Sequence, residues 1–337
     1  MKPIYFIIQK TCNHQTIIND GGGASELLFY MTALQLSNYF NIIIYNKEPN
    51  ELCIDNIQYK YLPDNNNPNI ENIQDSVIIV QRHFDVLIEL HKINPSNKYI
   101  LWSHDYLEYN SHLTGKYSYN EINKYFNTQN IQIISVSNFH KSNILSRMPN
   151  LNIKVIYNAL FSDLYKKNAD NIVNNNHIIF ASSWSKGLNN VLNIGKEYYK
   201  MNPNFKLLLL KPSYCSSNIN VNKYPFVECI GNIKNKDEYC RIMQSCLCVL
   251  TTSYQETFGC VFAEALHLGV PVLGDNSLQT GFQEIIEKEY MCNFTNPNEV
   301  IQKIEEIKNN RPIVELNSKF YSDIIMEEWK ELLDWNK

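Results

Sequence analysis

A regular alternation of short apolar runs with helical patterns constrains the fold of this chain more than any other feature. Several runs are apolar throughout, which is typical of strands buried on both faces of a parallel sheet. This alternation predicts a doubly wound α/β fold. The expected strands are 4–8, 41–45, 57–62, 76–80, 99–102, 131–135, 177–181, 206–210, 226–229, 247–252, 271–273 and 291–294.

The alternation restarts after a polar stretch between residues 158 and 176. Two series of about 150 residues predict two Rossmann-like domains, which we place at 1–158 and 159–311. A long amphipathic helix from about 312 to 337 is expected to pack back on the first domain. The other expected helices are 25–40, 188–201, 236–245, 260–268 and 299–308.

Composition argues against several classes of function. The net charge of −4, with no run rich in Lys or Arg, argues against nucleic-acid binding. No apolar stretch reaches the roughly 20 residues of a membrane-spanning helix, and the apolar run at the N-terminus is too short for a signal peptide. Nine cysteines without a CxxC pair indicate reduced thiols in a cytoplasmic protein. Clustered Cys/His spacing and Asp-x-Asp are absent, so no metal is expected.

The segment from Glu256 to Val272 is the most informative about function. It predicts a strand, a Thr-Phe-Gly turn, a helix and a new strand, because Gly269 and Pro271 end the helix. Glu256 lies in the turn and Glu264 lies early in the helix. In open α/β sheets, ligands bind at this end of the strands.

Three further segments follow or precede expected elements where ligands bind. Gly21-Gly22-Gly23 precedes the first long helix and suits either an anion site or a surface turn. It does not complete Gly-x-Gly-x-x-Gly, because Glu26 stands at the third glycine. His104 ends a strand and is either structural or catalytic. The hydroxyls and lysine of residues 182–186 suit either a diphosphate or a plain helix cap.

Taken together, these segments resemble the GT-B glycosyltransferases, specifically the retaining GT4 group. The resemblance covers most of the chain and is densest from Ile230 to Pro271. The most specific match is the pair of glutamates that bracket seven residues, Glu256 and Glu264, followed by Gly269 to Val272. Other matches occur in the family's order: Gly21 to Gly23, His104, Val136-Ser137, Val155 to Ala159, Lys186-Gly187 and Gly231-Asn232-Ile233.

Three positions depart from the family pattern. The family often has Gly-Arg before the lysine, with the arginine on the diphosphate, where this chain has Ala181-Ser182-Ser183. Ala159 replaces a glycine near the domain boundary, and Thr251-Thr252 replaces Pro-Ser before the first glutamate. Lys186 would therefore act on the diphosphate together with hydroxyl groups.

The resemblance implies two domains facing a cleft and transfer of a sugar from a UDP- or GDP-sugar. It further implies retention of anomeric configuration, with no tightly bound cofactor and no metal. His104, Glu256 and Lys186 are the implied catalytic residues. The implied donor-binding residues are Gly22, Gly23, Ser182, Ser183, Lys186, Gly231, Asn232, Ile233, Glu256, Thr257, Phe258, Gly259 and Glu264.

The implied roles follow the charge that develops on the donor. Lys186, the serine hydroxyls and backbone N–H groups around Gly259 would stabilise the leaving diphosphate. Glu264 would bind the ribose hydroxyls. Glu256 would hold sugar hydroxyls from the second domain, and His104 would contact the sugar from the first.

The sequence does not select the acceptor, for which a saccharide, a lipid-linked molecule and a protein all stay open. No basic amphipathic helix stands out, so a stable membrane anchor is not predicted, although peripheral membrane contact stays open. Two alternatives to a transferase also remain: a nucleotide-sugar epimerase of GT-B fold and a non-catalytic sugar-nucleotide-binding module. A nicotinamide dehydrogenase is the weakest alternative, because the glycine fingerprint is incomplete.

Overall fold

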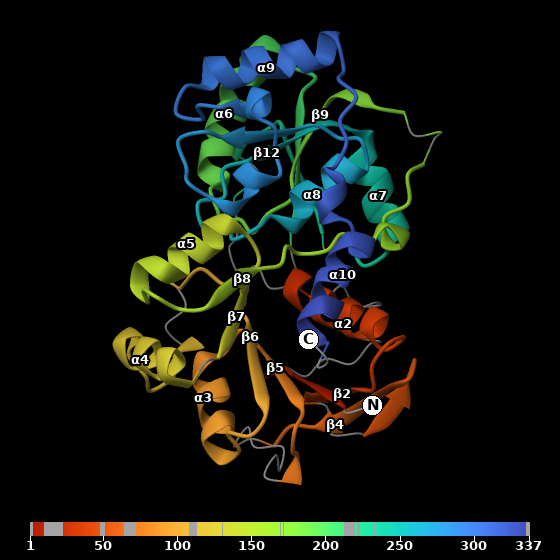
Figure 1. Ribbon diagram of the computed structural model, residues 1–337. Helices are drawn as coiled ribbons and strands as arrows, with labels where there is room; N and C mark the ends of the chain where they lie inside the picture. Colours follow the sequence, from red (N-terminus) through yellow and green to blue (C-terminus); the bar gives the residue numbers. More distant parts are fainter. Residues whose placement is uncertain are drawn as a thin grey trace. The chain divides into compact units, whose positions relative to one another are not determined.

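The computed structural model describes residues 3–9, 23–47, 51–63, 72–107, 113–129, 131–168, 170, 172–211, 220, 223–231 and 233–334. The chain divides into two compact units (Figure 1). Unit 1 comprises residues 1–159 and 322–337, and unit 2 comprises residues 160–321. Each unit has a sheet of its own.

Unit 1 is built on an eight-stranded sheet. Its strands are β1 (Ile4–Ile7), β2 (Ile42–Asn46), β3 (Leu52–Ile54), β4 (Ile57–Tyr61), β5 (Val77–Gln81), β6 (Lys98–Trp102), β7 (Gln132–Ser135) and β8 (Ile153–Val155). They are ordered β3-β4-β2-β1-β5-β6-β7-β8, and all neighbours are parallel except β3 and β4. The helices are α2 (Ala24–Leu36), α3 (Phe84–Ile93), α4 (Tyr119–Gln129), α5 (Asn138–Arg147) and α10 (Ser322–Leu333).

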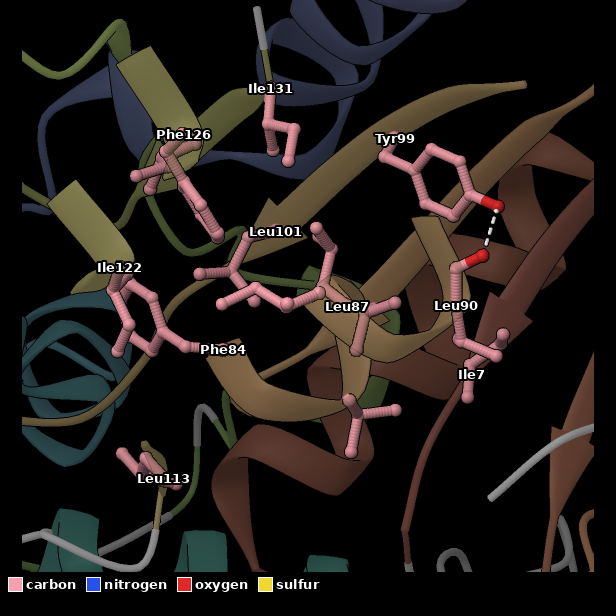
Figure 2. Close-up of a cluster of buried hydrophobic side chains, with 14 of the residues drawn as sticks. Ile7, Phe84, Leu87, Leu90, Tyr99, Leu101, Leu113, Ile122, Phe126 and Ile131 are labelled. Carbon is pink, nitrogen blue, oxygen red and sulfur yellow. Dashed lines mark hydrogen bonds between the residues drawn. The ribbon is translucent and has the colours of Figure 1, made fainter. Parts of the chain in front are cut away.

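The expectation of strands buried on both faces is confirmed for β2 and β5, which are buried along their whole length. One face of the sheet packs in a cluster with α3 and α4 (Figure 2). Phe84 and Leu87 of α3 lie there with Leu101 of β6 and Phe126 of α4. The one polar group drawn in the cluster is satisfied, because the Tyr99 hydroxyl donates to the Leu90 carbonyl at 3.0 Å.

Strand β3 was not predicted from the sequence. It forms a hairpin with β4 across Asp55 and Asn56, which have φ angles of 52° and 62°. Positive φ at both central residues is typical of a tight two-residue hairpin turn, and Asp and Asn tolerate it better than most side chains. Strand β8 and helices α3, α4 and α5 were also outside the predicted set.

The C-terminal helix begins later than the sequence suggested, at Ser322 and not near Pro312. Asn317 accepts from the backbone N–H of Lys319 at 3.1 Å, which favours a short 3₁₀ turn before the helix. The helix belongs to unit 1, as expected. The Trp329 ring lies 4.8 Å from that of Trp102, and the Lys98 ammonium donates to the Leu332 carbonyl at 2.8 Å.

Trp329→Ala is expected to lower the free energy of unfolding of unit 1 by about 3–5 kcal/mol, because the fully buried ring leaves a cavity. Urea denaturation followed by fluorescence measures this change. Glu327→Ala, on the same helix but with a side chain 66% exposed, should change stability by less than about 1 kcal/mol. Equal effects of the two substitutions would contradict the packing of α10 on this unit.

Unit 2 is built on a six-stranded sheet. Its strands are β9 (Asn174–Phe180), β10 (Lys206–Leu210), β11 (Val227–Ile230), β12 (Cys246–Thr251), β13 (Val272–Asp275) and β14 (Met291–Cys292). They are ordered β11-β10-β9-β12-β13-β14, and all neighbours are parallel. The helices are α6 (Leu188–Met201), α7 (Lys236–Ser245), α8 (Cys260–His267) and α9 (Pro297–Asn309).

In each sheet the order of strands reverses at one place. The first strand of unit 2, β9, lies between β10 and β12, so the chain builds outward from β9 in both directions. In unit 1 the corresponding pair is β1 and β5. Loops that leave the carboxyl ends of such a pair diverge toward opposite faces, which opens the crevice where doubly wound folds bind ligands.

Candidate active site

The candidate site of unit 2 begins where β9 and β12 end. The loop after β9 carries Ser182 to Gly187, and the loop after β12 carries Thr252 to Gly259. Hydrogen bonds join the loops: Ser253 Oγ donates to Ser182 Oγ at 3.3 Å, Thr252 Oγ1 donates to the Gly187 carbonyl at 3.1 Å, and the Tyr254 hydroxyl donates to the Ser185 carbonyl at 3.2 Å. Two segments about 70 residues apart in sequence therefore form one surface at the strand-order reversal.

An ion pair lies on this surface. The Lys186 ammonium is 3.0 Å from the Glu256 carboxylate, and their side chains are 30% and 17% exposed. A partly exposed pair adds little to stability. The pair matters because of where it lies: it places a cation, Lys186, next to a hydrogen-bond acceptor, Glu256, at the end of the sheet where ligands bind.

Glycines at the start of two helices let these loops approach each other. Gly187 precedes α6 with φ of 93°, and a Cβ there would lie 1.9 Å from Thr252 Oγ1. Gly259 precedes α8 with φ of 108°. A third segment packs beneath the turn, because the Gly281 N–H donates to the Glu256 carbonyl at 2.8 Å and a Cβ on Gly281 would lie 2.1 Å from the Thr257 carbonyl oxygen.

Gly187→Ala is expected to lower the free energy of unfolding by about 3 kcal/mol or more, because backbone strain and a clash with Thr252 add together. The matched control is Gly269→Ala. Gly269 also has a positive φ, 75°, but no atom lies within 4 Å of its added Cβ, so only the backbone cost of about 1–2 kcal/mol is expected. Chemical denaturation of both variants compares the two costs, and a smaller loss in Gly187→Ala would contradict the close approach.

Glu264 lies one turn into α8 and is 8% exposed. It accepts hydrogen bonds from two phenols, Tyr165 at 2.7 Å and Tyr239 at 2.6 Å. Burial, and then the nearby carboxylate, raise the pKa of both tyrosines well above 10. The two hydroxyls therefore stay protonated and keep donating to Glu264 at neutral pH.

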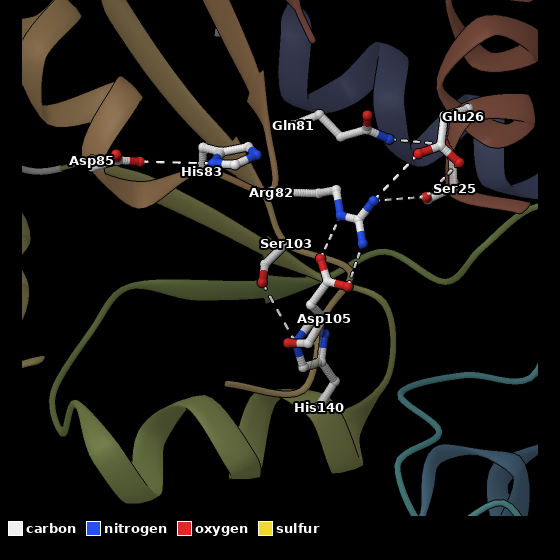
Figure 3. Close-up of polar contacts among 9 residues, drawn as sticks. All are labelled: Ser25, Glu26, Gln81, Arg82, His83, Asp85, Ser103, Asp105 and His140. Carbon is white, nitrogen blue, oxygen red and sulfur yellow. Dashed lines mark hydrogen bonds and ion pairs between the residues drawn. The ribbon is translucent and has the colours of Figure 1, made fainter. Parts of the chain in front are cut away.

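A second polar cluster occupies the strand-order reversal of unit 1 (Figure 3). Arg82 follows β5 directly and has φ of 70°, which is uncommon for a residue other than glycine. Its guanidinium donates to both Asp105 oxygens at 2.5 Å and to Glu26 at 3.3 Å. Burial opposes the charge of Arg82, but these two carboxylates outweigh it, so the pKa of Arg82 is raised. The cluster is thus a largely buried network in which one cation is shared by two carboxylates.

His140 of α5 contacts the backbone of the loop that carries Asp105. Its Nε2 lies 3.0 Å from the Asp105 backbone carbonyl, and its Nδ1 accepts from the Val136 N–H at 3.4 Å. The Ser137 hydroxyl caps α5 by accepting from the His140 N–H at 2.9 Å. The predicted element at Val136-Ser137 therefore begins a helix, and that helix fixes an imidazole against the loop that carries His104.

His104 itself is 8% exposed, and its ring centroid lies 4.7 Å from that of Trp102. Burial is the main cause that lowers its pKa to about 3, and the nearby Arg82 lowers it further. Burial likewise lowers the pKa of His140 to about 4. Both imidazoles are neutral at pH 7, so His104 is available as a hydrogen-bonding group and not as a cation.

The stability of unit 1 is expected to fall as the pH falls from about 6.5 to 4. In that window the unfolded chain protonates both imidazoles, with pKa near 6.5, while the folded chain excludes the protons. Each imidazole contributes a slope of up to about 1.4 kcal/mol per pH unit. Urea denaturation across this range should show a shallower slope in His140→Gln, and an unchanged slope would contradict the assignment of a neutral buried His140.

The other described residues predicted to bind the donor lie near the ends of strands and helices or in the core. Gly23 precedes α2 without a positive φ, and Gly231 and Ile233 follow β11 at the carboxyl edge of its sheet. Ser183 Oγ lies 3.0 Å from Ser185 Oγ, and the Phe258 side chain is buried, 5.6 Å from Phe320. Gly22 and Asn232 lie outside the described residues.

Two groups of residues in these sites were not predicted from the sequence: Arg82 with Glu26, and Tyr165 with Tyr239. Arg82 could have been found, because a charged residue directly after an apolar strand occupies the same kind of position as His104. No sequence signal links Tyr165 to Glu264, since they are 99 residues apart. Among the described residues, no three His, Cys, Asp or Glu side chains cluster so as to hold a metal ion, and no described helix is long and apolar enough to cross a bilayer.

The fold and these sites can be compared with known proteins. HepE of Anabaena in complex with UDP-glucose matches with a TM-score of 0.73 at 16% identity, over 99% of each chain. Sucrose-phosphate synthase of Thermosynechococcus elongatus matches with a TM-score of 0.68 at 14% identity, over 100% of this chain and 96% of the other. TarM matches with 0.64 at 17% over 79% of this chain, which spans only 57% of TarM. No curated protein matches this sequence.

At such identities the likenesses establish a fold, and that fold is GT-B: two units, each with a mostly or wholly parallel sheet flanked by helices. Residues 219–323 of this chain match the glycosyl transferases group 1 family. This domain, which includes Glu256 and Glu264, indicates that the protein is a glycosyltransferase. The predicted resemblance to GT-B glycosyltransferases is thereby confirmed.

Proposed function

We propose that the protein transfers a sugar from a nucleoside-diphosphate-sugar to a saccharide acceptor, with retention of configuration and without a metal. The observation that carries the proposal is the Lys186–Glu256 pair at the strand-order reversal of unit 2. A donor sugar and its diphosphate are covalent neighbours, so their binding groups must be neighbours too. A cation beside a hydroxyl acceptor meets this requirement.

In this mechanism the protein acts mainly on the leaving group. Lys186 faces the diphosphate as charge develops there, and the hydroxyls of Ser182 and Ser183 add donors. The helix dipole at the start of α8 favours an anion by roughly 0.3–1 kcal/mol. These donors would supply the charge stabilisation that a divalent cation provides elsewhere, which is the basis for proposing metal independence.

Glu256 would accept hydrogen bonds from sugar hydroxyls, and its pairing with Lys186 holds the carboxylate ready in the absence of donor. Glu264 would accept from the ribose. His104 of unit 1 would contact the sugar as a neutral group, consistent with the lowering of its pKa by burial. Retention, membership of the GT4 group and a cytoplasmic location rest on the resemblance and the composition.

The donor proposed first is a UDP-sugar, because the similar HepE binds UDP-glucose in its solved complex. GDP-sugars remain the second choice. A saccharide is the acceptor proposed first, and lipid-linked or protein acceptors would be tested beside it. Glycan biosynthesis is the corresponding cellular role.

Lys186→Gln is expected to lower kcat/KM by about 10²–10³-fold, because one donor to the leaving group is lost. Glu256→Gln should lower kcat strongly while leaving UDP affinity nearly unchanged, since its contact is with the sugar. Radiolabelled sugar transfer to a panel of acceptors measures kcat/KM, and calorimetry measures UDP binding. The matched control is Lys303→Gln, from the pair Lys303–Glu306 on α9, which is also 3.0 Å apart and should leave both unchanged.

Other outcomes would distinguish the alternatives. Conversion of the UDP-sugar without any acceptor would favour an epimerase. Binding of UDP-sugar by the wild type without turnover on any acceptor would favour a binding module. Equal losses of activity in Lys186→Gln and Lys303→Gln would contradict the proposed site.

A further inference from the structure

The carboxylate of Glu264, which is proposed to bind a ligand, already accepts hydrogen bonds from two tyrosines. Each of its two carboxylate oxygens accepts one phenolic hydroxyl: Oε1 from Tyr165 at 2.7 Å and Oε2 from Tyr239 at 2.6 Å. The three residues come from three different segments: Glu264 from α8, Tyr239 from α7, and Tyr165 from the loop before β9. As whole residues, Glu264 is 8% exposed and Tyr165 is 4% exposed.

The two phenols do not use all the hydrogen-bond acceptor sites of this carboxylate. An ionised carboxylate has about four lone-pair sites, two on each oxygen. The phenols occupy one site per oxygen, so one remains on each. They also stabilise a buried charge that would otherwise be costly, and they fix the rotation of the carboxylate about its terminal torsion, which is soft in a free glutamate.

Further contacts hold the two tyrosines that donate to Glu264. The Lys236 ammonium lies 3.3 Å from the Tyr165 hydroxyl, so the lysine donates to Tyr165 while Tyr165 donates to Glu264. The same ammonium lies 4.9 Å and 5.4 Å from the centroids of the Tyr165 and Tyr239 rings. At the other side, His267 Nε2 lies 2.9 Å from the Tyr165 carbonyl, which ties the tyrosine backbone to the end of α8.

We propose that Tyr165 and Tyr239 are positioning residues that orient Glu264 so that each oxygen offers one acceptor site to a vicinal diol. This inference rests on the proposed function, in which Glu264 binds the ribose of the donor nucleotide. A ribose carries two neighbouring hydroxyls on one face, and a carboxylate held in one plane matches them with one bond per oxygen. The tyrosine pair then sets the selectivity for ribonucleotide over 2′-deoxyribonucleotide.

The test measures this selectivity directly by calorimetric binding of UDP and 2′-deoxy-UDP. The wild type should bind UDP at least about tenfold more tightly than 2′-deoxy-UDP. Tyr165→Phe and Tyr239→Phe should each weaken UDP binding by about tenfold and leave 2′-deoxy-UDP binding nearly unchanged, so the ratio falls toward one. Lys236→Gln, a milder change of a partly exposed residue, should shift the ratio in the same direction by less. GDP and 2′-deoxy-GDP form a parallel pair if the wild type binds guanine nucleotides.

The chain offers a matched control in Tyr198→Phe. Tyr198 of α6 also donates its hydroxyl to a carboxylate, Glu305 of α9, in the same unit. Its loss should leave the ratio unchanged, and thermal unfolding of all variants verifies that they fold. Equal weakening for both nucleotides, or tighter UDP binding in either variant, would overturn the positioning role alone. Failure of the wild type to bind any nucleoside diphosphate would overturn the proposed function together with this inference.

Discussion

The parallel pairing of β9 with β12 is the constraint on which the candidate site depends. Val249 of β12 lies opposite Ile179 of β9, so the two strands end at the same edge although about 70 residues separate them in sequence. Because β10 takes the other side of β9, the loops after β9 and β12 meet at the strand-order reversal. The Lys186–Glu256 pair then follows from where two buried strands end.

Some helices and strands can be predicted from local sequence, and others cannot. The helices α6 and α7 have the predicted bounds, because an αL glycine and an asparagine cap mark their starts and apolar periodicity continues to their ends. Helix α10 was predicted to begin ten residues too early, at about 312 and not at Ser322, since periodicity says little about where extended chain gives way to helix. Strand β3 was missed because its three residues are too few to show a period, although its Asp-Asn turn is legible in retrospect.

The candidate sites divide in the same way. Residues that follow a strand, such as His104, Lys186 and Glu256, can be found from sequence because topology brings all such positions to one edge of a sheet. Partners that approach from elsewhere cannot. Tyr165 reaches Glu264 only through tertiary packing, and a tyrosine in a chain with 22 of them carries no local signal.

Each unit has a buried carboxylate that accepts hydrogen bonds from side chains of the protein itself. Asp105 receives two bonds from one guanidinium, and Glu264 receives one bond from each of two phenols. The difference matters for chemistry. A guanidinium paired in parallel with both oxygens compensates the charge of Asp105, and the pKa of that carboxyl is lowered because the bonds to Arg82 outweigh burial. Within the described part of the chain, the hydrogen-bond donors to Glu264 are two neutral phenols and not a cation, which suits the diol recognition proposed for this carboxylate.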